Sequence, residues 1–186
     1  MTIPEYVLQK AKQVTLLVSD VDGVFTDGSI YVGESGELKR FSVNDGMGIA
    51  LSRMTSLEIA LLSGRHSEAT SIRAEELGIG DHVYQGYLNK IVALREILKR
   101  FNVDTEHVAY IGDDYVDIPV MREVVLSFAV PNARDAVKAV ADLTLETHGG
   151  DGAVTEVIEL LLKARGEFDE ALEKMERKVY MVEEEI

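Results

Sequence analysis

Two carboxylates stand two residues apart after an apolar run near the start of the chain. Leu16–Ser19 is followed by Asp20 and Asp22, and then by Gly23. In a β-strand this spacing points both side chains the same way, because side chains alternate faces along a strand. Carboxylate oxygens suit Mg²⁺, and a carboxylate can also attack phosphorus as a nucleophile. The pair therefore indicates metal-assisted phosphoryl chemistry or, as the plainer alternative, an Asp-Gly turn that ends a strand.

A second acidic cluster follows another apolar run, His107–Ile111. Its members are Asp113, Asp114 and Asp117. Three carboxylates in so short a segment repel one another unless a cation compensates them. We expect Asp113, which is nearest to the strand end, to be a metal ligand, with Asp114 and Asp117 supporting the site. Capping of the following helix is the alternative role for Asp114.

Two further segments offer partners for a phosphate group. Ser63, Gly64 and Arg65 follow the run Leu57–Leu62, and a hydroxyl with free backbone N–H groups before a helix suits a phosphate oxygen. Lys90 stands at the start of a helical pattern, where a cation opposes the helix dipole. That position favours a phosphate partner. A helix-capping serine and a solvated lysine are the structural alternatives.

Apolar runs typical of strands alternate with amphipathic helical patterns along the chain. The runs are Val14–Ser19, Leu57–Leu62, His82–Tyr84, His107–Ile111, Leu126–Val130 and Leu143–Leu145. The helical patterns are Asp45–Met54, Ser67–Leu77, Leu88–Phe101, Val116–Val124, Ala133–Val140 and Ala153–Arg165. This alternation predicts an α/β fold with a doubly wound, mainly parallel sheet. Ligands bind beyond the carboxyl ends of such strands, where the polar clusters fall.

Two segments stand outside this alternation. Residues 28–43 contain two strand-like stretches around a glycine-bearing turn, which predicts a β-hairpin inserted after the first strand. The tail, about 166–186, predicts a helix that packs on its own domain or on another subunit. Its apolar stripe is Phe168, Leu172, Met175, Val179 and Val182. With 46% apolar residues, we expect residues 1–186 to form a single domain.

The composition excludes several classes of function. The chain has 33 acidic and 19 basic residues, a formal net charge of −14, which argues against nucleic acid or an anionic membrane as partner. It has no cysteine, so thiolate metal sites and cysteine nucleophiles are excluded. No segment approaches the ~20 apolar residues of a membrane span, and the first residues lack the apolar core of a secretory signal. We therefore expect a cytoplasmic protein.

In chain order, these motifs resemble those of a known family. Asp20-Val21-Asp22-Gly23, Ser63, Lys90 and Gly112-Asp113-Asp114 with Asp117 are similar to the four motifs of the haloacid dehalogenase-like hydrolases. The hairpin, Asn44-Asp45-Gly46 and Gly149–Val154 resemble a branch of that family that dephosphorylates keto-deoxy sugar acids. The resemblance runs from about Val14 to Ala171. It implies a Rossmann-like fold of this family with no separate cap domain.

The resemblance also implies a role for each matching residue. Asp20 would be nucleophile and Mg²⁺ ligand, Asp22 would be the general acid and base with its backbone carbonyl on the metal, and Asp113 would complete the metal site. The residues implied to contact phosphate or substrate are Ser63, Gly64, Arg65, Lys90, Asn44, Asp45 and Gly46. A homotetramer, formed through the hairpin with active sites at subunit interfaces, is implied as well.

The implied substrate is 3-deoxy-D-manno-octulosonate 8-phosphate, on the route to the lipopolysaccharide inner core. Glu68 follows the Ser63-Gly64-Arg65 segment and is an unfavourable neighbour for a substrate carboxylate, so a nine-carbon keto-deoxy sugar acid 9-phosphate remains an alternative. A non-catalytic phospho-receiver module, which also combines acidic residues with Mg²⁺, is the alternative from a different class.

Overall fold

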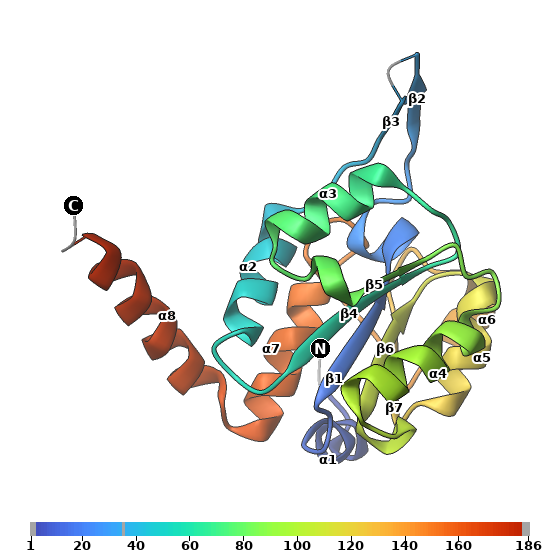
Figure 1. Ribbon diagram of the computed structural model, residues 1–186. Helices are drawn as coiled ribbons and strands as arrows, with labels where there is room; N and C mark the ends of the chain where they lie inside the picture. The colour runs from blue at the N-terminus through green and yellow to red at the C-terminus, as the bar shows by residue number, and fades with distance from the viewer. Residues whose placement is uncertain (1–2, 35, 184–186) are drawn as a thin grey trace.

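Within the residues that the structure describes, six parallel strands form the central sheet, in the order β5-β4-β1-β6-β7-β8 (Figure 1). This computed structural model describes residues 3–34 and 36–183, and the side chains as far as residue 178. The strands are β1 (Leu16–Asp20), β4 (Glu58–Ser63), β5 (Val83–Gln85), β6 (Val108–Gly112), β7 (Leu126–Ala129) and β8 (Leu143–Thr144). The predicted doubly wound parallel sheet is therefore confirmed, and the outermost strands β5 and β8 are its shortest.

Helices cover both faces of the sheet (Figure 1). They are α1 (Glu5–Ala11), α2 (Val43–Ser52), α3 (Glu68–Glu76), α4 (Lys90–Phe101), α5 (Ile118–Glu123), α6 (Asp135–Lys138), α7 (Ala153–Arg165) and α8 (Phe168–Glu183). Helix α7 contacts α1 and α2, while α4 contacts α5. Short helical turns span Val21–Phe25, Gly80–His82, Thr105–His107 and Tyr115–Asp117. Among the described helices, none is both long and apolar enough to cross a bilayer.

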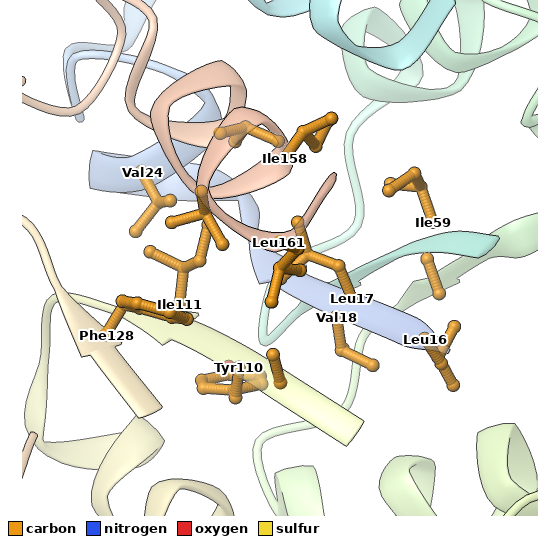
Figure 2. Packing of buried hydrophobic residues seen from close by; sticks show 14 of the residues in the cluster. Leu16, Leu17, Val18, Val24, Ile59, Tyr110, Ile111, Phe128, Ile158 and Leu161 are labelled. Carbon is orange, nitrogen blue, oxygen red and sulfur yellow. The ribbon is translucent and has the colours of Figure 1, made fainter. Parts of the chain in front are cut away.

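The core is centred on β1, which is buried along its whole length. Burial on both faces is expected for a parallel strand that is covered by helices on each side. Figure 2 shows Ile158 and Leu161 of α7 reaching toward the strands, where Leu17 and Ile111 lie. Each such side chain contributes about 1.5–3 kcal/mol when fully buried. This packing fixes the end of β1, and with it Asp20.

The carboxyl ends of three neighbouring strands are nearly level. Asp20 of β1 is paired with Leu62 of β4, and Ser19 with Ile111 of β6. The chain continues from β1 to β4 on one side and returns to β6 on the other. A crevice for ligands forms where the strand order reverses in this way. The polar residues that end β1 and β4 and follow β6 therefore meet at one edge of the sheet.

The hairpin forms a separate two-stranded antiparallel sheet of β2 (Tyr31–Gly33) and β3 (Gly36–Leu38). It projects from the body beyond the carboxyl ends of the central strands (Figure 1). Its position after β1 agrees with the prediction from the glycine-bearing turn.

Helix α8 begins against the body and then leaves it (Figure 1). It contacts α7 and α2, and Phe168 and Met175 pack on the core, whereas Leu172 is exposed. The predicted stripe also includes Val179 and Val182, whose side chains lie outside the described residues. The expectation that the tail packs on its own domain therefore applies to the first part of the helix.

Candidate active site

A buried lysine stands at the centre of the acidic cluster. Lys90 is the first residue of α4 and is only 3% exposed, so it is not a solvated surface lysine. Its Nζ lies 2.6 Å from Oδ1 of Asp20 and 2.6 Å from Oδ1 of Asp117. A buried ammonium is tolerated when carboxylates pair with it and accept its hydrogen bonds. The structure thus brings together three residues that the sequence separates widely.

Asp117 holds this cluster in place. Its Oδ1 accepts hydrogen bonds from Lys90 and from the Tyr110 hydroxyl at 2.6 Å, and its Oδ2 accepts from the backbone N–H groups of Asp113 and Asp114 at 3.0 Å. Both oxygens are therefore occupied by donors, which gives Asp117 a supporting role. Sequence reasoning missed Tyr110, because a tyrosine inside an apolar strand gives no separate signal.

Negative charge accumulates where Asp20 and Asp113 meet. One carboxylate oxygen from each of Asp20, Asp113 and Asp117 lies within 4.8 Å of the others. Burial, followed by the charges of Asp20 and Asp117, raises the pKa of Asp113 to about 8. Burial also raises the pKa of Asp20 to about 6, although Lys90 opposes this shift. Such shifts mark a site where a further cation would stabilise the ionised carboxylates.

The donor set fits a divalent cation. Asp113 Oδ1 is buried and receives no hydrogen bond within the described part of the chain. Gly23 leaves room for this carboxylate: its φ is +101°, and a Cβ at that position would overlap Asp113. Because both oxygens of Asp117 are already occupied, Asp20 and Asp113 are the carboxylates available to a metal such as Mg²⁺.

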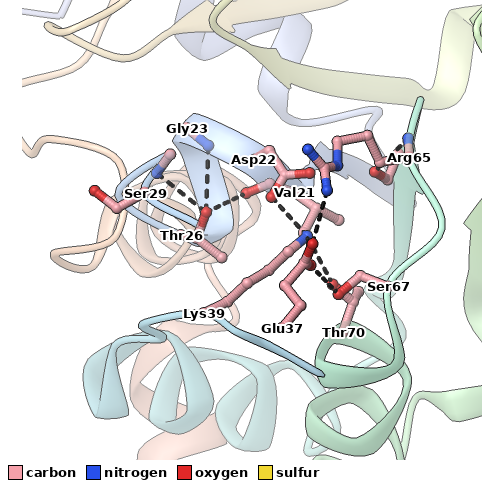
Figure 3. Close-up of polar contacts among 12 residues, drawn as sticks. Val21, Asp22, Gly23, Thr26, Ser29, Glu37, Lys39, Arg65, Ser67 and Thr70 are labelled. Atoms are coloured by element: carbon pink, nitrogen blue, oxygen red, sulfur yellow. Dashed lines mark hydrogen bonds and ion pairs between the residues drawn. The ribbon is translucent and has the colours of Figure 1, made fainter. Parts of the chain in front are cut away.

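Asp22 lies in the turn Val21–Phe25, directly after β1. Its Oδ1 is 2.7 Å from Nζ of Lys39, which comes from the base of the hairpin (Figure 3). The same region contains Glu37, whose carboxylate contacts Arg65. Sequence reasoning missed Lys39 and Glu37 as site residues. Their spacing of two, which places both on one face of a strand, is the signal that was available.

The segment after β4 forms a polar loop. Ser63 is almost fully buried, and its Oγ accepts a hydrogen bond from the backbone N–H of Arg65 at 3.1 Å. The hydroxyl keeps its own proton available for donation. Gly64 lies between the two residues, and Arg65 points its guanidinium to Glu37 at 2.7 Å. This loop follows the strand next to β1, so Ser63 ends its strand at the same edge as Asp20.

The resemblance implies that Asn44, Asp45 and Gly46 contact the phosphate or the substrate, but two of these three residues are buried in the fold. Asp45 is fully buried, and its Oδ1 accepts the N–H of Thr155 in the first turn of α7 at 3.0 Å. Burial raises the pKa of Asp45 to about 6. Gly46 packs against α3, where a Cβ would fall 2.7 Å from Nη2 of Arg73. Asp45 and Gly46 therefore have structural roles, and Asn44, which is exposed, is the member of this segment that is accessible to a ligand.

Two side chains fix the loops around the site. Asp114 caps the turn Tyr115–Asp117 and pairs with Arg134 at 2.7 Å, which agrees with the capping alternative. Asn132 donates a hydrogen bond to the carbonyl of Gly23 at 3.1 Å and accepts one from the N–H of Gly149 at 2.9 Å. Asn132 thus ties the turn after Asp20 to the glycine-rich loop before α7. No local sequence pattern indicated this role.

Comparisons with known proteins agree with the motifs. The model of the haloacid dehalogenase-like hydrolase family matches residues 50–158. The chain is 44% identical to the 3-deoxy-D-manno-octulosonate 8-phosphate phosphatase of Salmonella typhi over 91% of this chain and 90% of that protein. A crystal structure of the Yersinia pestis phosphatase of the same name is similar with a TM-score of 0.86, at 43% identity over 89% of each chain. The Moraxella catarrhalis phosphatase, solved with magnesium, phosphate and KDO, has a TM-score of 0.86 at 39% identity, over 91% of this chain and 97% of that one.

Proposed function

This chain belongs to the haloacid dehalogenase-like hydrolases, and we propose that it hydrolyses 3-deoxy-D-manno-octulosonate 8-phosphate to the free sugar acid and phosphate. It is a phosphoric monoester hydrolase, and its reaction serves the lipopolysaccharide inner core. The observation that carries this proposal is the meeting of Asp20, Lys90 and Asp113 at the end of β1 in a chain so similar to phosphatases of that name.

Asp20 is the proposed nucleophile. One of its oxygens attacks phosphorus, the ester bond breaks, and an aspartyl-phosphate forms. Asp22 gives its proton to the leaving alkoxide and then takes a proton from the water that hydrolyses the intermediate. Lys90 and Ser63 are proposed to bind the phosphoryl oxygens, with N–H groups of the Gly64–Arg65 loop beside them. The 2.6 Å contact between Lys90 and Asp20 supports this assignment.

Asp20, Asp113 and the backbone carbonyl of Asp22 are the proposed ligands of Mg²⁺. The bound ion supplies charge neutralisation at the phosphoryl group. The unpartnered oxygen of Asp113 and the raised pKa values of Asp113 and Asp20 support this ligand set. Arg65 and Asn44 are the proposed contacts of the sugar acid, since both are exposed near the polar loops.

Phosphate release from eight- and nine-carbon keto-deoxy sugar acid phosphates tests this function. We expect the highest kcat/KM for the eight-carbon substrate, loss of turnover after removal of Mg²⁺, and no turnover by Asp20→Asn with its fold intact. A preference for the nine-carbon substrate would overturn the proposed substrate alone. A stable phosphoprotein without turnover would instead indicate a receiver module.

A homotetramer with active sites at subunit interfaces is part of the proposal. The hairpin supports it, because Tyr31, Val32 and Leu38 are 60%, 82% and 68% exposed. Apolar side chains gathered on one projecting element favour a protein interface. We also propose a cytoplasmic location, because a phosphorylated sugar acid carries several charges and does not cross a bilayer unaided.

A further inference from the structure

The base of the hairpin places a buried cation beside the turn that follows β1. Lys39, labelled in Figure 3, comes one residue after β3. Its side chain is 0% exposed. Its Nζ lies 2.7 Å from Asp22 Oδ1, 3.4 Å from Thr70 Oγ1 and 3.7 Å from Glu37 Oε1. Burial of an ammonium is costly, so these polar partners hold it firmly.

The carboxylate of Asp22 is held by its ion pair with Lys39. Neither of its carboxylate oxygens accepts a hydrogen bond elsewhere in the described part of the chain, so the ion pair with Lys39 is what fixes the side chain. A general acid and base must hold its oxygen within hydrogen-bond reach of the reacting atoms. The orientation of Asp22 therefore depends on a residue from outside the parallel sheet.

We propose that Lys39 is a positioning residue, which orients Asp22 for both proton transfers. This inference rests on the proposed function, because Asp22 acts there first as acid and then as base. In the first step the proton passes from Asp22 to the oxygen of the breaking phosphoester bond. In the second step water attacks the aspartyl-phosphate, its proton passes to Asp22, and Asp20 leaves phosphorus as a carboxylate. Lys39 stays protonated throughout and transfers no proton.

Glu37 fixes Lys39 and thereby couples the hairpin to the site. Its Oε2 pairs with Nη2 of Arg65 at 2.7 Å, and its Oε1 accepts a hydrogen bond from Oγ of Ser67 at 2.8 Å. The bond from Ser67, with the charges of Lys39 and Arg65, lowers the pKa of Glu37, so this carboxylate stays ionised. Strand β3 is thus tied to the loop after β4 on one side and to Asp22, through Lys39, on the other.

Lys39→Met tests the proposal, because methionine keeps the length of the side chain and removes its charge. For the sugar acid phosphate we expect kcat to fall about tenfold or more, with KM changed by less than about twofold. Lys39→Arg retains a cation and should recover part of this loss. Lys163→Met is the matched control: Lys163 is an exposed lysine of α7 paired with Glu159 at 2.6 Å, and its removal should leave kcat unchanged.

An aryl phosphate separates positioning from a merely structural role. p-Nitrophenolate leaves without a proton, so Lys39→Met should still form the aspartyl-phosphate but hydrolyse it slowly. We expect a burst of p-nitrophenolate that is larger relative to the steady rate than in the wild-type protein. Equal losses on both substrates without a burst, or a kcat close to wild type, would overturn the proposal.

An inactive wild-type protein and a variant that does not fold have different meanings from the results above. If the wild-type protein turns over neither substrate with Mg²⁺, the proposed function fails, whatever the variant does. If Lys39→Met does not fold, Lys39→Arg and Glu37→Gln replace it, since each keeps a polar group in place. Both should show the burst in milder form, and its absence from both would contradict a role for Lys39.

Discussion

At the scale of single residues, the site contains more buried carboxyl groups than buried cations. Asp20, Asp113 and Asp117 bring three carboxyl groups together, and within the described residues Lys90 is the one ammonium paired with them. Donors from Lys90, Tyr110 and two backbone N–H groups satisfy Asp117. Asp113 and Asp20 are less well compensated. Burial, together with the charges of the neighbouring carboxylates, raises the pKa values of both. A bound cation would remove this imbalance.

Stability and Mg²⁺ binding should therefore change with pH in opposite directions. The folded pKa of Asp113, about 8, lies above its ordinary value of 3.8. Its contribution to the stability of the metal-free protein is fully present below that ordinary value and is lost as the pH rises through about 8. Because Mg²⁺ binds the ionised carboxylate, the increase in Tm caused by Mg²⁺ should be larger at about pH 8.5 than at about pH 5.

Thermal unfolding with and without Mg²⁺ at the two pH values measures this effect. Asp113→Asn, which keeps the shape of the side chain but cannot ionise, is the control. It should lose most of the Mg²⁺-induced shift at both pH values. An equal shift at the two pH values in the wild-type protein would contradict the prediction.

At the scale of elements, the turn after β1 shapes the site as much as the strand does. Gly23 adopts a left-handed conformation, and the glycine-rich loop before α7 packs directly on the same turn, where the N–H of Gly150 donates to the carbonyl of Val24 at 2.9 Å. The turn is thus held between Asp113 on one side and this loop on the other. The Asp113 carboxylate leaves no space for a Cβ at position 23, and Gly23 in turn leaves none for a Cβ at position 149.

Gly23→Ala should disrupt the proposed metal site. The added methyl group would overlap the Asp113 carboxylate, and the left-handed backbone costs alanine about 1–2 kcal/mol. We expect a loss of Mg²⁺ affinity in calorimetric titration and a fall in kcat of about 100-fold. Gly33→Ala is the control for the added methyl group, because within one chain nothing lies within 4 Å of its Cβ position, and it should leave the Mg²⁺ affinity unchanged. Wild-type Mg²⁺ affinity in Gly23→Ala would contradict this assignment.

At the scale of the whole molecule, the projecting hairpin should determine the state of assembly. We expect light scattering of the wild-type protein to give four times the 20.5 kDa mass of one chain. Val32→Asp should lower this mass, because it places a charge in the proposed apolar interface. Ile72→Asp alters an isoleucine of α3 that is 61% exposed and should leave the mass unchanged. A wild-type protein with the mass of one chain would exclude the tetramer.

The sequence predicts most of the framework because its signals are local. Helix α7 has the predicted bounds Ala153–Arg165. The glycines on either side, Gly152 and Gly166, both have positive φ, and the left-handed Gly166 ends the helix at its C-terminus. Strand ends differ by a residue or two, as apolar runs do not mark where hydrogen bonding stops. Helix α1 was missed, since only Val7 and Ala11 of its seven residues are buried and leave little periodicity.

The site is harder to predict where its contacts are distant in sequence. Asp20, Ser63 and Asp113 could be predicted, because each lies at the end of an apolar run or directly after it. The contact of Asn132 with Gly23 spans 109 residues, and no pattern around Asn132 indicates it. Asp45 lies in a segment whose composition is typical of a polar binding loop. Its carboxylate instead accepts the N–H of Thr155 at the start of α7, 110 residues later in the chain. The role of Asp45 depends on the packing of α2 against α7, and that of Asn132 on the approach of two loops; a linear pattern contains neither.

The two outermost strands of the central sheet have a consequence for the protein in concentrated solution. Strand β5 has three residues and β8 has two, so each flank of the sheet exposes few unpaired backbone groups. Long, free flanks are templates onto which another chain adds strands and begins fibrillar aggregation. With flanks this short and a net charge of −14, the folded protein should resist aggregation of that kind even when crowded.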